Sequence, residues 1–223
     1  MDPNNPVVRL CVAGMQAEAA GDPTRASTLF HEAWTTATDD YEACIAAHYL
    51  ARHQHTPEDV LHWNEECLSR ADKVADERVQ GFYPSLHLNI AKAHQDLNND
   101  DKATHHYQAA AEQVHNLPPG PYTDGIRFAI AEGLNKANNP NQTEPPDLAL
   151  LLEKLCQRTA LKPLGLLLPA YLGNLGTTED QTKLLTAAQM LHASRSLPPD
   201  EQELLARTIT TLTATLAATV QKQ

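Results

Sequence analysis

Histidine is the residue type in this sequence whose number and spacing could indicate a metal site or a catalytic site. The chain of 223 residues has 11 His. Six of them cluster along the chain as His48, His53, His55 and His62, and as the adjacent pair His105 and His106. Zinc sites on helices usually need His four residues apart, or pairs of Cys. His48 and His53 are five apart, while His87 and His94 share a face but make an incomplete site. The pattern favours surface and packing histidines, and no bound metal is expected.

The other reactive residues also lack a catalytic pattern. The four cysteines are far apart, form no CxxC pair and each fall in an apolar helical pattern, which is typical of buried free thiols in a reducing cytoplasm. They are Cys11, Cys44, Cys67 and Cys156. The sequence has no GxSxG, HExxH, GxxxxGK[ST] or GxGxxG motif. Residues 96–101 have the composition of a calcium loop but lack its alternating ligands and closing Glu. We therefore expect no cofactor and no enzymatic activity, with a His-containing helical enzyme as the weaker alternative.

Negative charge is concentrated in the first part of the chain. Lys and Arg total 17 against 28 Asp and Glu, and residues 1–140 hold 20 of the acidic and ten of the basic residues. Phosphate and anionic lipid surfaces are bound by clustered Lys and Arg, so neither a nucleic-acid nor a membrane partner is expected. A basic protein partner suits this charge better. The start MDPNNPVVRL lacks the pattern of a signal peptide, and residues 164–175 are too short to span a bilayer. A soluble, cytoplasmic protein is expected.

Helices are the elements that must position these residues. Ala and Leu are abundant, and runs of alternating β-branched residues are scarce. In residues 88–113 two helical patterns meet at an Asn-Asn-Asp-Asp turn, which predicts an antiparallel helix pair. The second pattern places Ala103, Tyr107 and Ala110 on one stripe, and Ala91 would let the two helices approach closely.

The same pairing occurs earlier in the chain. Gly14, Ala26, Phe30 and Ala33 match Ala91, Ala103, Tyr107 and Ala110 of the later pair. The helices expected before the later pair cover residues 7–20, 23–37, 41–54 and a fourth from Pro57. Val60 lies 34 residues after Ala26, but Ala103 lies 43 after Val60. The nine extra residues are expected to lengthen the fourth helix to Gly81 and to disturb the stacking just before Leu88.

A 34-residue helix–turn–helix unit with small and aromatic residues in this arrangement resembles the tetratricopeptide repeat (TPR). Residues 7–40 and 84–117 match well, and residues 41–74 match moderately, with Val60 in place of the usual Ala. The resemblance covers about half of the chain. It implies an all-α solenoid of three repeats that acts as a scaffold or adaptor and holds a partner's peptide or helix in a concave groove. The partner-binding residues that it nominates are Met15, Glu18, Glu42, Tyr49, Arg52, His53, Asn89, Lys92, Gln95 and Asp96.

The remaining segments complete the expected architecture. Residues 122–137 are expected to form a seventh helix that caps the solenoid of residues 1–139. The Asn- and Pro-rich residues 140–146 would be a linker to a helical C-terminal region, residues 147–223. The helices expected there cover residues 147–159, 162–176 (interrupted at Pro169 and Gly173), 178–195 and the segment from Pro199.

The last helix carries an apolar stripe that needs a partner surface. Its residues are Leu205, Ile209, Leu212, Leu216 and Val220. The partner surface could be the solenoid, the helix around Leu164 or another subunit. Two alternatives to a free groove therefore stay open: a groove filled by the protein's own seventh helix or C-terminal region, and a homo-oligomer assembled through the C-terminal helices.

Overall fold

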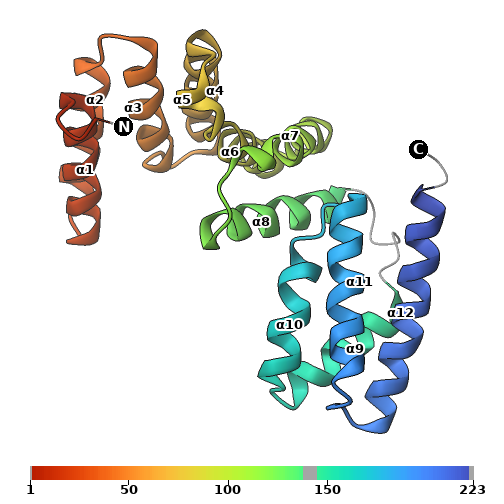
Figure 1. The fold of residues 1–223 in the computed structure, drawn as a ribbon. Helices are drawn as coiled ribbons and strands as arrows, with labels where there is room; N and C mark the ends of the chain where they lie inside the picture. Colours follow the sequence, from red (N-terminus) through yellow and green to blue (C-terminus); the bar gives the residue numbers. More distant parts are fainter. Residues whose placement is uncertain (1, 138–144, 221–223) are drawn as a thin grey trace. The chain divides into compact units, whose positions relative to one another are not determined.

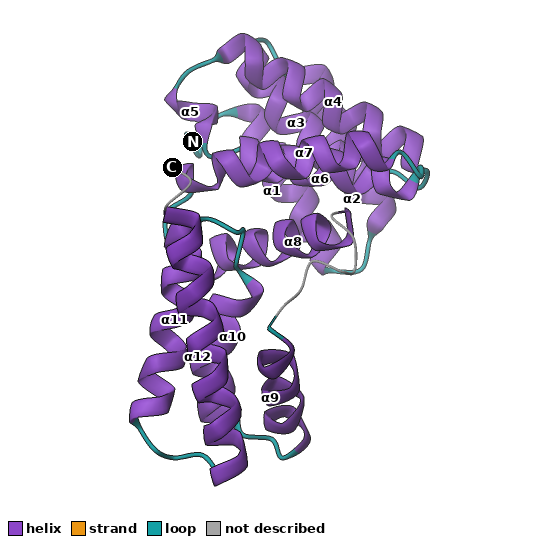
Figure 2. Ribbon diagram, turned by 90° about the vertical axis from the view of Figure 1, so that its right-hand side faces the viewer, coloured by secondary structure: helices purple, strands orange, loops and turns teal. Residues whose placement is uncertain are grey.

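The structure, a computed structural model, describes residues 2–137 and 145–220. Every regular element in this part of the chain is helical, which confirms the expected all-α class (Figures 1 and 2). In chain order the elements are α1 (Pro6–Ala19), α2 (Pro23–Thr36), α3 (Asp40–Arg52), α4 (Pro57–Val74), α5 (Glu77–Gln80), α6 (Tyr83–Asp96), α7 (Asp100–Gln113), the 3-10 helix η1 (Val114–Asn116), α8 (Pro121–Ala137), α9 (Pro146–Gln157), α10 (Leu161–Leu172), α11 (Thr178–Ala193) and α12 (Pro199–Val220).

The chain divides into two compact units, Met1–Pro118 and Pro119–Gln223, called here the first and second unit. The helix expected to cap the solenoid, α8, is part of the second unit. Its Arg127 donates a hydrogen bond of 2.9 Å to the carbonyl of Gly173 and pairs with Asp180. The division at Pro118 thus precedes the expected linker, of which residues 140–144 lie outside the described residues.

The first unit is built from three antiparallel helix pairs, α1–α2, α3–α4 and α6–α7 (Figure 1). They correspond to the three repeats expected at 7–40, 41–74 and 84–117, so the TPR-like arrangement is confirmed. Local chemistry fixes where several of these helices begin. Asp22 and Thr56 accept hydrogen bonds from backbone amides of the first turn, and Pro23 and Pro57 follow them at the first helical position.

The small and aromatic residues that define the repeat are packing residues. A Cβ atom added at Gly14 would lie 2.2 Å from Cε1 of Phe30, so only glycine lets α1 approach that ring. Phe30 and Ala26 are both fully buried. In the third pair Ala91 and Tyr107 are buried at the corresponding positions. The matched positions therefore form the interior of each pair, as the sequence predicts.

The prediction of one long fourth helix ending at Gly81 is wrong. Helix α4 stops at Val74 because Ala75 takes a left-handed conformation with φ of 49°. Asp76 then caps α5 by accepting a hydrogen bond from the Arg78 amide. A local Asp side chain competes with helix continuation in this way. The break turns Val79 inward, where it is fully buried among side chains of α3, α4 and α6.

Replacing Ala75 with Gly is expected to stabilise the protein. A residue with a Cβ in the left-handed region costs about 1–2 kcal/mol, and the extra chain entropy of Gly offsets part of the gain, which leaves a net gain of about 0.5–1 kcal/mol. Urea denaturation followed by circular dichroism measures the change. The control is Ala37→Gly at another helix end, where φ is −59° and Gly should destabilise. Equal effects of the two substitutions would contradict the strained conformation of Ala75.

In the second unit, α9, α10, α11 and α12 surround a leucine core. Leu151, Leu155, Leu167 and Leu205 are fully buried in it. Helix α10 runs unbroken from Leu161 to Leu172 with Pro169 inside it, so the interruption expected at Pro169 does not occur. The helix ends at Gly173, the second expected interruption.

The apolar stripe of α12 is covered within its own unit. Leu205 and Leu212 are buried, and Ile209 packs against the same core as Leu164 of α10. Leu216 is half-buried, and the side chain of Val220 lies outside the described residues. Helix α12 packs along α11 and α9 (Figure 2). The stripe therefore contributes to the core of the second unit, and Leu205 and Leu212 are not left for another subunit.

Candidate partner-binding surface

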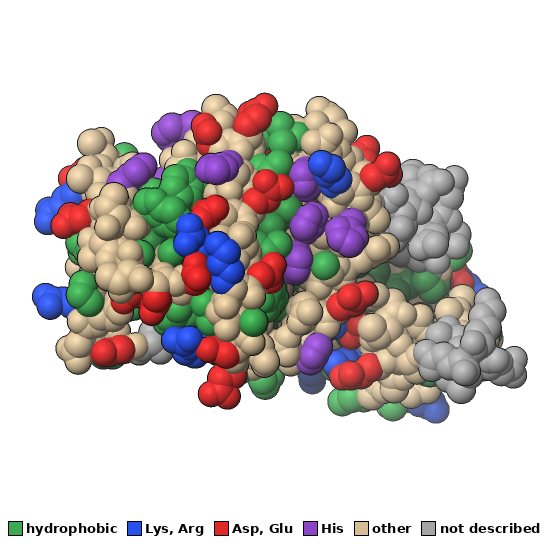
Figure 3. Space-filling model, turned by 90° about the horizontal axis from the view of Figure 1, so that it is seen from above, with side chains coloured by type: hydrophobic (Ala, Val, Ile, Leu, Met, Phe, Trp, Pro, Cys, Tyr) green, Lys and Arg blue, Asp and Glu red, His purple; other side chains and the backbone are tan. Residues whose placement is uncertain are grey.

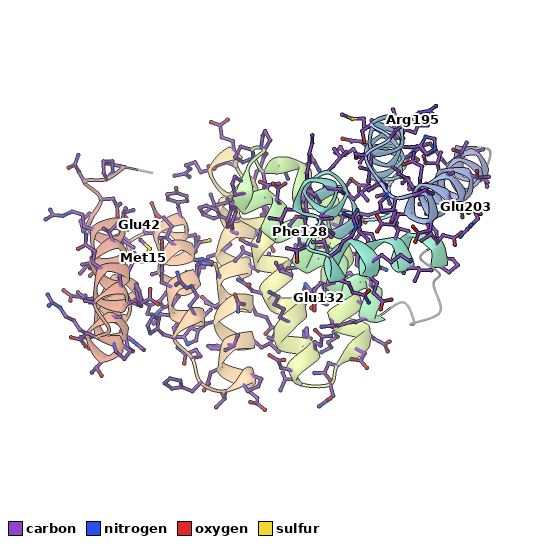
Figure 4. The ribbon with its side chains drawn as sticks, turned by 90° about the horizontal axis from the view of Figure 1, so that it is seen from below. Met15, Glu42, Phe128, Glu132, Arg195 and Glu203 are labelled. Atoms are coloured by element: carbon purple, nitrogen blue, oxygen red, sulfur yellow. The ribbon has the colours of Figure 1, made fainter. Side chains whose placement is uncertain are left out.

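Five of the nominated residues form one surface on α1 and α3. They are Met15, Glu18, Tyr49, Arg52 and His53, and we call them the Tyr49 patch. Met15 and Tyr49 pack against one buried cluster that includes Phe30. Figure 4 shows Met15 between the two helices. Helix α1 packs directly against α3, which brings the five side chains together from two repeats.

Glu18 is the polar centre of this patch. Its Oε1 accepts a hydrogen bond of 2.8 Å from Nε2 of His53 and a longer one of 3.4 Å from a terminal nitrogen of Arg52. The side chains of Glu18 and His53 are 26% and 12% exposed, whereas Arg52 is 47% exposed. Glu18 thus holds His53 firmly and Arg52 loosely, so the guanidinium keeps donors for another acceptor.

Two rings contact Tyr49. It stacks on Phe30 with ring centres 5.2 Å apart, and the His48 ring lies 5.4 Å away at 77° to it. The Arg52 guanidinium lies 5.8 Å from the centre of the Tyr49 ring, within the range of a cation–π interaction. Burial raises the pKa of the Tyr49 phenol, which therefore stays a neutral hydrogen-bonding group. Tyr49 and Arg52 together form a half-exposed aromatic and cationic pair on a rigid base.

Glu42 is engaged by the protein itself. One carboxylate oxygen accepts a hydrogen bond of 2.6 Å from the Asn5 amide, and the other accepts from the backbone and hydroxyl of Thr38 at 2.7 and 2.8 Å. The Thr38 backbone bond, followed by the Asn5 bond, lowers the pKa of Glu42. Because Asn5 also caps α1, Glu42 ties the start of α3 to the start of α1.

The four nominated residues on α6 are separate from the Tyr49 patch. Lys92 and Asp96 are exposed, Asn89 is half-buried, and Gln95 accepts a hydrogen bond of 3.0 Å from the Tyr107 hydroxyl. Helix α3 packs directly against α1, the first helix of the preceding pair. Helix α6 packs instead against α4, the second helix of its preceding pair. The inserted α5 accompanies this change, in agreement with the stacking disturbance expected before Leu88.

Three histidines meet between α6 and α7. Nδ1 of His87 lies 3.0 Å from Nδ1 of His106, and the rings of His94 and His106 are 5.7 Å apart. The spacing of His87 and His94 predicts that they share a face, but it does not predict that His106 lies beside them. In an antiparallel pair that turns at Asn98, residue 106 lies opposite residue 90, which is between His87 and His94 in the sequence. The register of the two helices therefore indicates that His106 lies beside them. Within the described residues, no group of three or more His, Cys, Asp or Glu is placed to hold a metal ion.

The cysteines are free in the structure. Cys11, Cys44 and Cys67 are buried, and burial raises the pKa of the Cys11 thiol to about 12. The sulfurs of Cys44 and Cys67 are 3.5 Å apart, and the Cys67 thiol donates to the Cys44 carbonyl. Cys156 is exposed, so its expected burial is wrong. It follows Leu155 on α9 and lies beside the buried face of that helix.

Over residues 2–137 and 145–220, no helix combines the length and the apolar character that crossing a membrane requires.

Comparisons with known proteins add a likeness of fold. No family model and no curated protein matches the sequence. Among solved structures, the chain is similar to one described as "Podosopora anserina putative kinesin light chain nearly identical TPR-like repeats". The two are 15% identical with a TM-score of 0.49, and the match covers 95% of this chain and 98% of that chain. The function proposed below rests on the residues of this chain itself.

Proposed function

We propose that the protein is a non-enzymatic interaction module that binds a segment of a partner protein at the Tyr49 patch. The observation that supports this best is the exposed Arg52 guanidinium beside the Tyr49 ring. The Tyr49 ring is held in place by stacking on Phe30. Tyr and Arg are enriched among residues that dominate protein interfaces. Met15 adds a half-buried, adaptable apolar side chain next to them. The mechanism is equilibrium binding, without a cofactor.

The charge of the first unit favours a basic partner. Residues 1–118 contain 18 Asp and Glu but eight Lys and Arg. Such an excess accelerates the association of a positively charged protein and disfavours nucleic acid and anionic membranes. Free thiols 3.5 Å apart, as at Cys44 and Cys67, agree with action in the reducing cytoplasm.

The test compares two charge reversals on neighbouring helices of the first unit. Arg52→Glu changes the Tyr49 patch, and Arg25→Glu makes the same change at an exposed site on α2. A partner is first captured from cell extract with the wild-type protein and identified, and its Kd for each purified variant is then titrated. Truncating an interface hot spot costs about 2 kcal/mol or more, so Arg52→Glu should raise Kd about 30-fold.

Arg25→Glu should leave the Kd within about twofold, since surface charges away from an interface mainly affect long-range attraction. Circular dichroism of both variants checks that the fold is intact. Equal Kd values for the two variants would remove the Tyr49 patch from the interface. Capture of the chain's own copies alone would instead favour self-association.

A further inference from the structure

His87, His94 and His106 form a compact group between α6 and α7, which we call the histidine trio. The ring centres of His87 and His106 are 5.2 Å apart, and those of His94 and His106 are 5.7 Å apart. Figure 3 shows histidine side chains gathered over these two helices. The trio therefore lies on the contact that holds the third helix pair together.

The geometry of the trio requires at least one neutral ring in the His87–His106 pair. Nδ1 of His87 and Nδ1 of His106 are 3.0 Å apart, so one nitrogen donates the proton and the other accepts it. Protonating both rings leaves no acceptor for this hydrogen bond and brings two positive charges together. His94 is 3% exposed, and its buried Nδ1 has no hydrogen-bond partner. A charge on this ring is poorly solvated as well.

The groups that face the trio do not reverse this preference. From α4, Asp72 acts favourably on a positive His87 and Glu65 on a positive His94. Asp72 already accepts a hydrogen bond from the Tyr83 hydroxyl at the start of α6. From α7, Lys102 and the exposed His105 act in the opposite direction. Burial is the largest effect for all three rings, and it lowers the pKa of each, that of His106 to about 4.

We propose that the histidine trio makes the α6–α7 pair an acid-sensitive lock, whose closed state loses stability below about pH 6 while α1–α4 keep theirs. Helix pairs in a repeat array contact only their neighbours, so a terminal pair can open by itself. Opening would release Asn89, Lys92, Gln95 and Asp96 from their places on α6 and would leave the Tyr49 patch intact. The lock is independent of the proposed function.

The direction of the pH effect follows from proton linkage. A histidine in the opened pair has a pKa near 6.5, above that of each ring in the closed pair. The opened pair therefore binds more protons, and the closed pair loses stability as pH falls from 6.5 towards the lower pKa values. With a closed-state pKa of about 4 for His106, this ring alone favours opening about tenfold at pH 5.5. This window lies above the range in which Glu42, with its lowered pKa, is protonated.

Burial also lowers the pKa of His48 on α3, so one ring of the second pair responds to acid in the same sense. His48 acts alone, however, whereas three coupled rings lie between α6 and α7. The third pair should consequently open first. A comparison of the pairs within one protein detects this difference.

The test is hydrogen–deuterium exchange of the full chain at pH 7.0 and 5.5, corrected for the intrinsic exchange rate and read by mass spectrometry. Protection of α6–α7 amides is expected to fall about tenfold at pH 5.5, and that of α1–α2 amides by less than about twofold. His106→Gln, which cannot be protonated, should remove most of the selective loss. His115→Gln, at the exposed position of η1, is the matched control and should leave the selective loss unchanged.

An equal loss of protection in α1–α2 and α6–α7, or an unchanged selective loss in His106→Gln, would overturn the proposal. If His106→Gln does not fold, the wild-type protein decides the question through NMR titration of its histidine rings. The His106 ring is then expected to titrate well below pH 6.5, and a pKa at or above 6.5 would also overturn the proposal.

Discussion

Phe30→Ala is expected to lower the free energy of unfolding of the first unit by about 3–5 kcal/mol, the range measured for removing a buried aromatic ring. The ring is fully buried and lies against Gly14 of α1. On the α3 side its centre is 5.2 Å from that of Tyr49 and 4.8 Å from that of His53. Removing it leaves a cavity between two helix pairs and takes away the base of the Tyr49 patch. Chemical denaturation of the full chain, monitored by circular dichroism, measures the loss.

The fit between Phe30 and Gly14 gives a second measurement of the same contact. Gly14→Ala should destabilise by about 1–2 kcal/mol, because the overpacking cost exceeds the gain in helix propensity. Gly165→Ala on α10 is the matched control, since an added Cβ there meets nothing within 4 Å. It should stabilise by up to about 1 kcal/mol. If Gly14→Ala stabilised the protein like Gly165→Ala, the close approach of α1 to Phe30 would be disproved.

Arg127→Ala is expected to lower the stability of the second unit by about 2–4 kcal/mol, because removing one partner of a buried ion pair leaves the other charge uncompensated. The Asp180 side chain is 5% exposed and pairs with Arg127 of α8. In the variant, Asp180 keeps hydrogen bonds from the Leu175 amide and the Thr177 hydroxyl. The loss of stability should therefore be smaller than the largest losses found when a buried ion pair is broken. Arg127 also donates to the Gly173 carbonyl, so the variant loosens α8 from the end of α10. Thermal unfolding followed by circular dichroism measures the effect.

The matched control lies on the same helix. Lys136 pairs with Glu132, and the two side chains are 59% and 68% exposed. Because exposed pairs contribute little, Lys136→Ala should change stability by less than about 0.5 kcal/mol. In an Asp180→Asn background, Arg127→Ala should cost less than in the wild type, since the buried charge is gone. Equal costs in both backgrounds would show that the ion pair is not the source of the stability.

The parts of the fold that depend on local chemistry could be predicted from the sequence. Asp22-Pro23 and Thr56-Pro57 begin helices because a side-chain cap and a proline act within one turn. Gly14 and Phe30 could be matched because the repeat places a small residue opposite a large one. The break at Ala75 could not, because alanine gives no signal for a left-handed conformation.

Other differences arose from contacts between distant residues. The sequence assigned α8 to the solenoid, and the pairing of Arg127 with Asp180 across 53 residues is invisible to local patterns. In the candidate site, the resemblance nominated Glu18, Arg52 and His53 separately. Their hydrogen-bond network depends on the register between α1 and α3, which no single helix pattern contains. The same holds for Glu42, which Asn5 engages from another helix.

Site-specific photo-crosslinking tests the central claim most directly, namely that the face formed by α1 and α3 binds a partner protein. A photoreactive amino acid replaces Met15 in the Tyr49 patch in one protein and exposed Thr28 on α2 in another. After irradiation in cell extract, position 15 is expected to crosslink a distinct partner protein, and position 28 is not. The Arg52→Glu change should weaken the crosslink from position 15. Crosslinks of equal yield from both positions, or none from position 15 while a partner is captured, would contradict this account.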